Sequence, residues 1–141
     1  MWRSRLPLML AGLWWGSLST VGFWVVPMLF AHLATPAVAG AMAAKLFAAQ
    51  TWVGLGCGLL LLMLSRPRGE TTLATWAKAN LGLVLAAMLL ALLSEFAVAP
   101  RIVARDNLAL WHGVGTGLYA LQWLLTAAVF WRMAGSSHRT D

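Results

Sequence analysis

Four side chains in a very apolar chain have the chemistry to bind a ligand: His32, Gln50, Glu95 and His112. Imidazole and carboxylate groups bind metal ions, imidazole also binds haem iron, and both exchange protons. Ionisable groups inside apolar segments are costly to keep there, so they often mark a functional site. The chemistry that these types allow is metal binding, haem ligation, proton transfer, or a structural pairing of the four with one another and with Arg101.

The stretch 108–126 shows how such groups are positioned. Helical periodicity places a polar and aromatic stripe on one side of it, made of His112, Thr116, Tyr119, Trp123 and Thr126. Polar groups in a membrane face protein or a cavity, because lipid offers them no hydrogen-bond partners. The stripe is therefore predicted to face the protein interior.

Composition gives the elements that hold these residues. The chain has 141 residues, of which 61% are hydrophobic and 10% are charged, and its mean hydropathy is +0.78. Four apolar runs are each long enough to cross a bilayer core of about 30 Å. We predict an all-α, polytopic membrane protein, a four-transmembrane-helix bundle forming a single domain over 1–141. The predicted spans are about 7–30, 41–64, 76–99 and 108–131.

Local signals predict where these helices begin and bend. The candidate N-caps are Thr35 before Pro36 for the second span, Thr71 or Thr72 for the third, and Asp106 or Asn107 for the fourth. Pro27 lies inside the first apolar run and is predicted to kink it or to loosen its last turn.

The distribution of basic residues predicts the topology. Arg3, Arg5, Arg66, Arg68, Lys78, Arg132 and Arg139 fall on one side of the predicted spans, and Lys45, Arg101 and Arg105 fall on the other. The excess marks the cytoplasmic side. We therefore predict a membrane protein with both termini in the cytoplasm. The net charge of +6 is dispersed among loop ends, which favours the lipid bilayer as partner and not nucleic acid.

With these spans, the four chemically active side chains lie within about 10 Å of the outer boundary. We predict an outer-leaflet polar pocket made of His112, Glu95, Gln50, His32, Thr116, Tyr119 and Arg101. Its candidate metal ligands are His112, Glu95 and His32. Structural roles are the alternatives: an ion pair of Glu95 with Arg101, an interfacial position for His112, and a plain loop position for His32.

A short match between two segments of the sequence indicates an internal repeat. Residues 52–58 (WVGLGCG) match residues 111–117 (WHGVGTG), and each match follows a span with a proline near its outer end. Such an echo would correspond to two parallel helix pairs related by an axis along the membrane normal.

Several short motifs, in their order, resemble a known family. They are Val26-Pro27-Met-Leu29-Phe30, Gly40-Ala-Met-Ala-Ala-Lys45-Leu46-Phe47, Pro100-Arg101 and Trp111-His112-Gly113. This pattern is similar to that of the transmembrane protein 205-like domain family, whose bacterial members are small four-helix inner-membrane proteins of unknown function. The resemblance covers residues 14–122 and implies four spans and a location in the bacterial inner (plasma) membrane. Because the animal member is associated with platinum-drug resistance, it also implies metal or solute handling.

The first span also resembles two haem- or metal-related membrane families, the copper-resistance D type and the membrane protoporphyrinogen oxidase. The shared stretch runs from Gly22 to His32 and contains Pro27, Leu29 and Phe30. The oxidase family places a histidine near the start of its first span, where this chain reads Arg5-Leu-Pro-Leu-Met-Leu10. That departure removes the main support for haem chemistry of the oxidase type.

Two functional hypotheses follow, together with a structural alternative. In the first, the chain is not an enzyme and handles a metal cation or small solute through the outer-leaflet pocket. In the second, it is a membrane redox protein that binds haem b, with His112 and His32 as axial ligands. The alternative is a structural or assembly subunit of a larger membrane complex. The glycine pairs are suited to close helix packing, including packing within a homo-oligomer.

Overall fold

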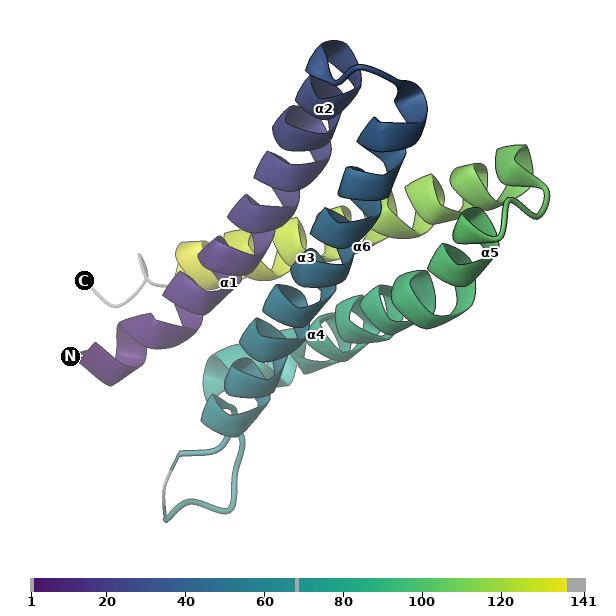
Figure 1. Cartoon of the computed structure of the whole chain (residues 1–141). Helices are drawn as coiled ribbons and strands as arrows, with labels where there is room; N and C mark the ends of the chain where they lie inside the picture. Colours follow the sequence, from purple (N-terminus) through teal and green to yellow (C-terminus); the bar gives the residue numbers. More distant parts are fainter. Residues whose placement is uncertain (1, 68, 137–141) are drawn as a thin grey trace.

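A computed structural model describes residues 2–67 and 69–136 of the chain. Four long helical rods make up this part, and two of the rods are interrupted by a π-helical segment (Figure 1). Their elements are α1 (Trp2–Thr20), η1 (Val21–Val25) and α2 (Val26–His32); α3 (Pro36–Leu64); α4 (Thr75–Leu93), η2 (Ser94–Val98) and α5 (Ala99–Val103); and α6 (Leu108–Ser136). The predicted all-α four-helix architecture is confirmed.

Each rod is long and apolar enough to span a membrane, over Arg5–His32, Pro36–Leu64, Thr75–Val103 and Leu108–Gly135. These spans are longer than the predicted ones. The difference matters most in α3, which begins at Pro36 and not at residue 41. The Thr35 hydroxyl accepts a hydrogen bond from the Val38 N–H at 3.3 Å, so the predicted cap and N1 proline do start this helix.

The other two predicted caps have different outcomes. The Asn107 side chain accepts a hydrogen bond from the Leu110 N–H at 3.4 Å and caps α6 as predicted. The prediction of Thr71 or Thr72 as the cap of α4 is wrong, because the helix begins at Thr75 and Ala74 occupies the cap position. The connection before α4 is held by backbone instead, with the Ala74 N–H donating to the Ser65 carbonyl at 2.8 Å.

The two ends of the bundle differ in packing. We call the end with the connections 33–35 and 104–107 the distal end, and the end with the connection 65–74 the proximal end. α1 packs against α3 and α6, and α4 packs against the same two helices. The core cluster lies in the proximal and middle parts of the rods: Leu10, Ala11, Trp14, Leu18, Cys57, Leu61, Val84, Ala87, Val129 and Met133. The distal ends lie outside this cluster.

The chain contains an internal repeat of two parallel helical hairpins, the first from α1 to α3 and the second from α4 to α6. Buried positions of α1 and α4 match at a spacing of 73 residues: Pro7 and Asn80, Ala11 and Val84, Trp14 and Ala87, Leu18 and Ala91. Buried positions of α3 and α6 match at a spacing of 72: Gln50 and Gln122, Gly54 and Thr126, Cys57 and Val129, Leu61 and Met133. The sequence echo of residues 52–58 and 111–117 has another register. It joins the middle of α3 to the beginning of α6, so it does not mark equivalent positions.

Contacts between the hairpins follow the same repeat. The Trp15 ring in α1 stacks on Phe130 in α6, with ring centroids 5.5 Å apart. The equivalent pair joins α4 to α3, where the Met88 side chain packs against Gly58 so closely that no Cβ would fit. The two hairpins therefore repeat the same pattern of buried positions and contacts.

Candidate functional site

Gln50 lies in the middle of α3, 5% exposed, and belongs to the packing between the rods. Its side-chain amide donates to the Ser17 hydroxyl at 2.9 Å, and that hydroxyl donates to the Trp14 carbonyl at 2.8 Å. Since α3 runs from Pro36 to Leu64, Gln50 is about 21 Å along the axis from either end. Gln50 therefore lies farther from the distal end of its helix than the predicted start at residue 41 implied, because the helix starts earlier than the apolar run suggested.

Tyr119 forms a junction between three rods. Its hydroxyl donates to the Leu18 carbonyl at 2.6 Å, and its ring meets Phe47 of α3 edge-on, with centroids 5.3 Å apart. The ring also lies against Gly22, where an added Cβ would come within 2.6 Å of it. Tyr119 thus joins α6 to the first rod and to α3. We call Phe47, Tyr119 and Gly22 the aromatic floor.

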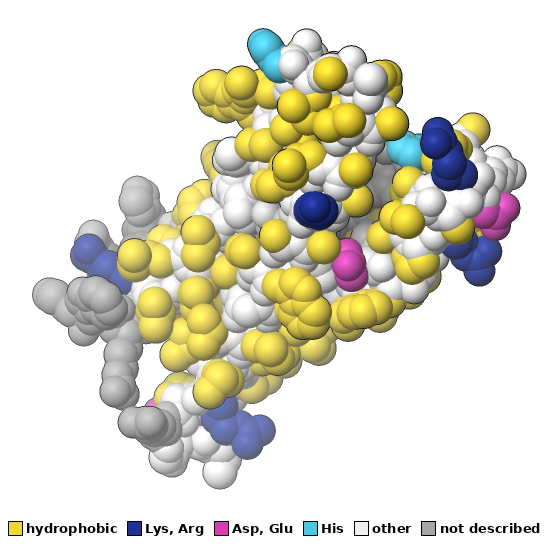
Figure 2. All heavy atoms as spheres, viewed as in Figure 1, with side chains coloured by type: hydrophobic (Ala, Val, Ile, Leu, Met, Phe, Trp, Pro, Cys, Tyr) yellow, Lys and Arg dark blue, Asp and Glu magenta, His cyan; other side chains and the backbone are white. Residues whose placement is uncertain are grey.

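Above this floor, toward the distal end, the hairpins separate. α2 packs against η1 and α3, whereas α5 packs against η2 and α6. Neither α2 nor α5 contains a buried residue. Figure 1 shows the distal ends of the two hairpins diverging, and Figure 2 shows a hollow between them. We call this hollow the distal cleft.

Two residues of the predicted stripe continue from Tyr119 toward the distal end of α6. Thr116 and His112 are both exposed and lie about 5 and 10 Å farther along the helix axis than Tyr119. Figure 2 shows a histidine, an acidic side chain and a basic side chain around the distal cleft. Glu95 in η2 is half-buried and Lys45 in α3 is exposed. These two elements, with α6, surround the cleft.

The contact between η2 and α6 shows how Glu95 and His112 lie relative to each other. An added Cβ on Gly115 would lie 3.4 Å from Val98 and 3.7 Å from Ile102, so the helices are in contact there. Because the two segments are antiparallel, Glu95 lies on the proximal side of this contact and His112 on the distal side, about 9 Å apart along the helix axes. The acidic and imidazole groups are thus carried by packed segments of the second hairpin.

Both described histidines are fixed in the same way. Nδ1 of His112 lies 3.1 Å from the Leu108 carbonyl, and Nδ1 of His32 lies 3.0 Å from the Met28 carbonyl. A carbonyl oxygen only accepts hydrogen bonds, so Nδ1 carries the proton in each ring. In the neutral ring Nε2 then has a free lone pair, the arrangement in which histidine binds metal ions or protons.

Arg101 contacts an aromatic ring near the loop between α5 and α6. Its guanidinium lies 4.4 Å from the centroid of the Trp111 ring, a cation–π distance. The next residues make a tight connection in which Arg105 and Asn107 have φ values of 57° and 36°. Arg101 therefore helps to hold the distal end of the second hairpin together.

The predicted metal ligands do not form a three-residue cluster. Within residues 2–67 and 69–136, no group of three His, Cys, Asp or Glu side chains is placed to hold a metal ion. His112 and Glu95 belong to the second hairpin, and His32 ends α2 in the first. The structure thus places His32 on the other hairpin, and Glu95 and His112 at different depths of the second hairpin.

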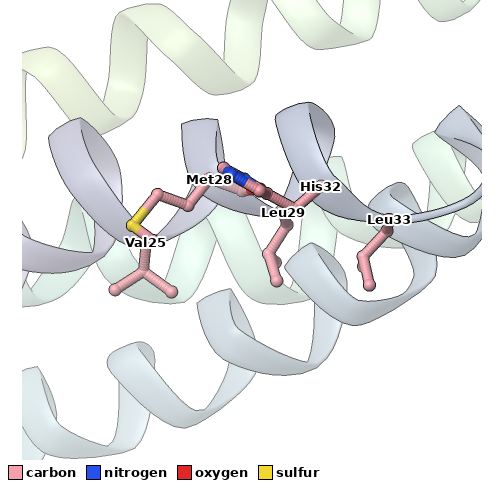
Figure 3. Close-up of a pocket in the computed structure, with 5 residues that line it drawn as sticks. All are labelled: Val25, Met28, Leu29, His32 and Leu33. Atoms are coloured by element: carbon pink, nitrogen blue, oxygen red, sulfur yellow. The ribbon is translucent and has the colours of Figure 1, made fainter.

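His32 instead lies at a shallow apolar groove of about 380 Å³ on one face of the first rod (Figure 3). The lining residues recur at helical spacing: Val25, Met28, Leu29, His32 and Leu33. Four of these five side chains are apolar, which suits contact with lipid at this depth of a span.

Sequence reasoning missed three of the contacts that shape the site: Phe47 on Tyr119, Gly22 under the Tyr119 ring, and Ser17 on Gln50. A signal was present for the first, because Phe47 and Tyr119 are equivalent positions of the repeat. The second depends on tertiary contact alone, since an isolated helical glycine has many uses.

A model of a family described as a domain of unknown function (DUF4149) matches residues 9–109, more than half of the chain. No curated protein and no solved structure matches. The match includes the first three rods and the loop that leads into α6. The chain belongs to the DUF4149 family, a family without an assigned function, and four of its helices have the length and composition of membrane spans.

Proposed function

We propose that this chain is a small inner-membrane protein that binds a metal cation, or a small solute carrying one, at the distal cleft. The observation that supports this most directly is the separation of the two hairpins above the aromatic floor. It leaves His112 and Thr116 exposed on α6, in a molecule whose described spans are otherwise closely packed near their middle. The likeness to transmembrane protein 205-like proteins is part of the same proposal.

In this proposal, Nε2 of His112 is the cation ligand, and the carboxylate of Glu95, nearer the middle of the bundle, attracts the cation to the cleft. A single protein ligand leaves the remaining coordination positions of a cation to water or to solute groups, which favours weak and exchangeable binding. Thr116 and Tyr119 line the approach, and His32 is peripheral. Gln50 has a structural role through Ser17, and Arg101 has one through Trp111.

The distal end faces the periplasm in this proposal, and both termini are cytoplasmic. The support is the bias of basic residues along the sequence: seven were predicted on the cytoplasmic side, and three, Lys45, Arg101 and Arg105, on the other side, which is the distal one.

A calorimetric titration of Zn²⁺ into the full chain, in lipid nanodiscs, tests the binding groups. We expect His112→Ala to weaken binding by about 10-fold or more, as removal of a direct ligand does, and Glu95→Gln to weaken it less, because that change removes only an attracting charge. His32→Gln is the matched control, because its ring has the same backbone contact but lies on the other hairpin; it should bind as the wild type does. Equal affinity for Zn²⁺ of the wild type and of the double variant His112→Ala, Glu95→Gln would refute the proposal.

The absorption spectrum of the same purified preparation separates the haem alternative. A metal- or solute-binding protein without haem has no Soret band. A Soret band that His112→Ala abolishes would replace our proposal with a haem-binding role.

A further inference from the structure

The first rod of each hairpin has the same interruption at the same place. The π-helical segments are η1 (Val21–Val25) and η2 (Ser94–Val98), and a proline follows each by two residues. The sequences match as well: Phe23-Trp-Val25-Val-Pro27 and Phe96-Ala-Val98-Ala-Pro100, spaced by 73 residues like the buried positions. Two independent stretches of one chain thus share the motif Phe-x-Val-x-Pro with a local backbone geometry that is rare in helices.

The proline explains the geometry. It has no N–H to donate to the carbonyl four residues earlier, and its ring clashes with that carbonyl in a regular α-helix. That carbonyl belongs to Phe23 in η1 and to Phe96 in η2. The wider turn is closed by bonds over five residues, from the Val26 N–H to the Val21 carbonyl and from the Ala99 N–H to the Ser94 carbonyl. Each rod therefore has a weakened hydrogen-bond ladder at this point.

What lies beyond each interruption is loosely held. α2 has seven residues and α5 has five, and neither helix has a buried residue. The parts of the rods before the interruptions are firmly packed, with Leu18 0% and Ala91 1% exposed. Segments with few buried contacts are the ones that move at low free-energy cost.

The pivot points border the distal cleft. η1 contains Gly22, which lies under the Tyr119 ring of the aromatic floor, and η2 contains Glu95. A change of angle at the distal end of either segment would leave Gly22, Phe47 and Tyr119 in contact and would move α2 or α5 across the cleft. From this geometry we infer that η1 and η2 are paired hinges that open and close the distal cleft. The role of the cleft rests on the proposed function, whereas the motion of the hinges does not.

Distance measurement between the two moving arms tests this inference. Spin labels on cysteines at Ala31 and Val103, both exposed, report the separation of α2 and α5 by double electron–electron resonance in nanodiscs. The background carries Cys57→Ser, because Cys57 is the only native thiol. A second pair at Met9 in α1 and Met63 in α3, both exposed near the proximal end, reports the packed part of the first hairpin.

We expect a broad distance distribution for the Ala31–Val103 pair and a narrow one for the Met9–Met63 pair. The double variant Pro27→Ala, Pro100→Ala restores the missing N–H groups, so it should narrow the first distribution to about the width of the second. Pro36→Ala is the matched control, since Pro36 is the first residue of α3 and lies outside both hinges. It should change neither distribution.

An Ala31–Val103 distribution as narrow as that of the proximal pair would overturn the hinge inference, and so would one that the double proline variant leaves unchanged. Far-ultraviolet circular dichroism and thermal unfolding of the double variant confirm that it is folded. The outcomes separate from those of the proposed function. If α2 and α5 move but Zn²⁺ does not bind, the hinges are supported and the cation site is contradicted. If Zn²⁺ binds but α2 and α5 are rigid, the cation site is supported and the hinges are contradicted.

Discussion

At the scale of single residues, the polar groups of the chain have two distinct roles. Gln50, Ser17 and Tyr119 satisfy one another or the backbone inside the bundle. His112, Thr116 and Lys45 are exposed near the distal end. Residue type alone did not distinguish the buried, hydrogen-bonded residues from the exposed ones, since both sets lie within apolar runs. The depth of a residue in its helix decides its role, and that depth depends on where the helix begins.

Gly22→Ala tests the aromatic floor. An added Cβ would lie 2.6 Å from the Tyr119 ring, so the ring or the rod must shift, which costs about 1–3 kcal/mol. Gly16→Ala is the matched control in α1, because no heavy atom lies within 4 Å of its added Cβ. That variant should be neutral or stabilising by about 0.5–1 kcal/mol. Thermal unfolding in detergent measures both, and equal melting temperatures for the two variants would contradict the contact.

Gln50→Leu tests whether Gln50 is structural. The change removes one interhelical hydrogen bond, and such bonds in membrane proteins contribute about 0.6 kcal/mol on average and about 1.7 kcal/mol at most. We expect a small loss of stability and an unchanged affinity for Zn²⁺. A loss of Zn²⁺ binding in a folded Gln50→Leu variant would place Gln50 in the site and would contradict the roles assigned here.

At the scale of elements, helix existence was predictable and helix interruption was not. Apolar runs of about 20 residues are sufficient to predict spans. The caps Thr35 and Asn107 could also be found from their types. A π-helical turn leaves the hydrophobic pattern nearly unchanged, so only Pro27 gave a sign of η1. The sequence signal for the interruptions is the repeated Phe-x-Val-x-Pro motif, which becomes visible only when the two hairpins are compared in the correct register.

The connection between α5 and α6 provides a test at this scale. Arg105 has a φ of 57°, in the left-handed region that costs about 1–2 kcal/mol for residues with a Cβ. We expect Arg105→Gly to raise the melting temperature. Ala104→Gly is the matched control, because Ala104 has a φ of −70° and gains nothing from glycine; it should lower stability. A lower melting temperature for Arg105→Gly would show that its side chain contributes more than the strain costs.

At the scale of the whole molecule, the two main features are the internal repeat of the hairpins and the uneven distribution of basic residues. The parallel repeat means that both hairpins enter the membrane from the same side. The sequence contained this symmetry in the spacing of buried positions, but the conspicuous Trp-Gly echo has a spacing of 59 residues and matches unequal depths. Burial cannot be read from residue type alone when two thirds of a helix is apolar, which is why the correct register needed the structure.

Labelling in intact cells tests the proposed orientation. In the Cys57→Ser background, a cysteine at Asp106 should react with a thiol reagent that does not cross the inner membrane, and a cysteine at Glu70 should not. Both positions are exposed in connections between rods, so accessibility to solvent is matched. Labelling of Glu70→Cys with protection of Asp106→Cys would reverse the orientation and would place the distal cleft toward the cytoplasm.

The parallel arrangement of the hairpins has a consequence for how the chain could be reconnected. The beginning of α1 and the end of α6 lie at the same end of the bundle as the turn between α3 and α4 (Figure 1). In a circularly permuted gene, a short polar linker would join the N- and C-termini, and the new termini would lie in the 65–74 turn. With the rods numbered in chain order, this gene would encode the same four rods in the order three, four, one, two. Each rod would still cross the bundle in its native direction, so we expect the permuted chain to form the same bundle, which its thermal unfolding would check.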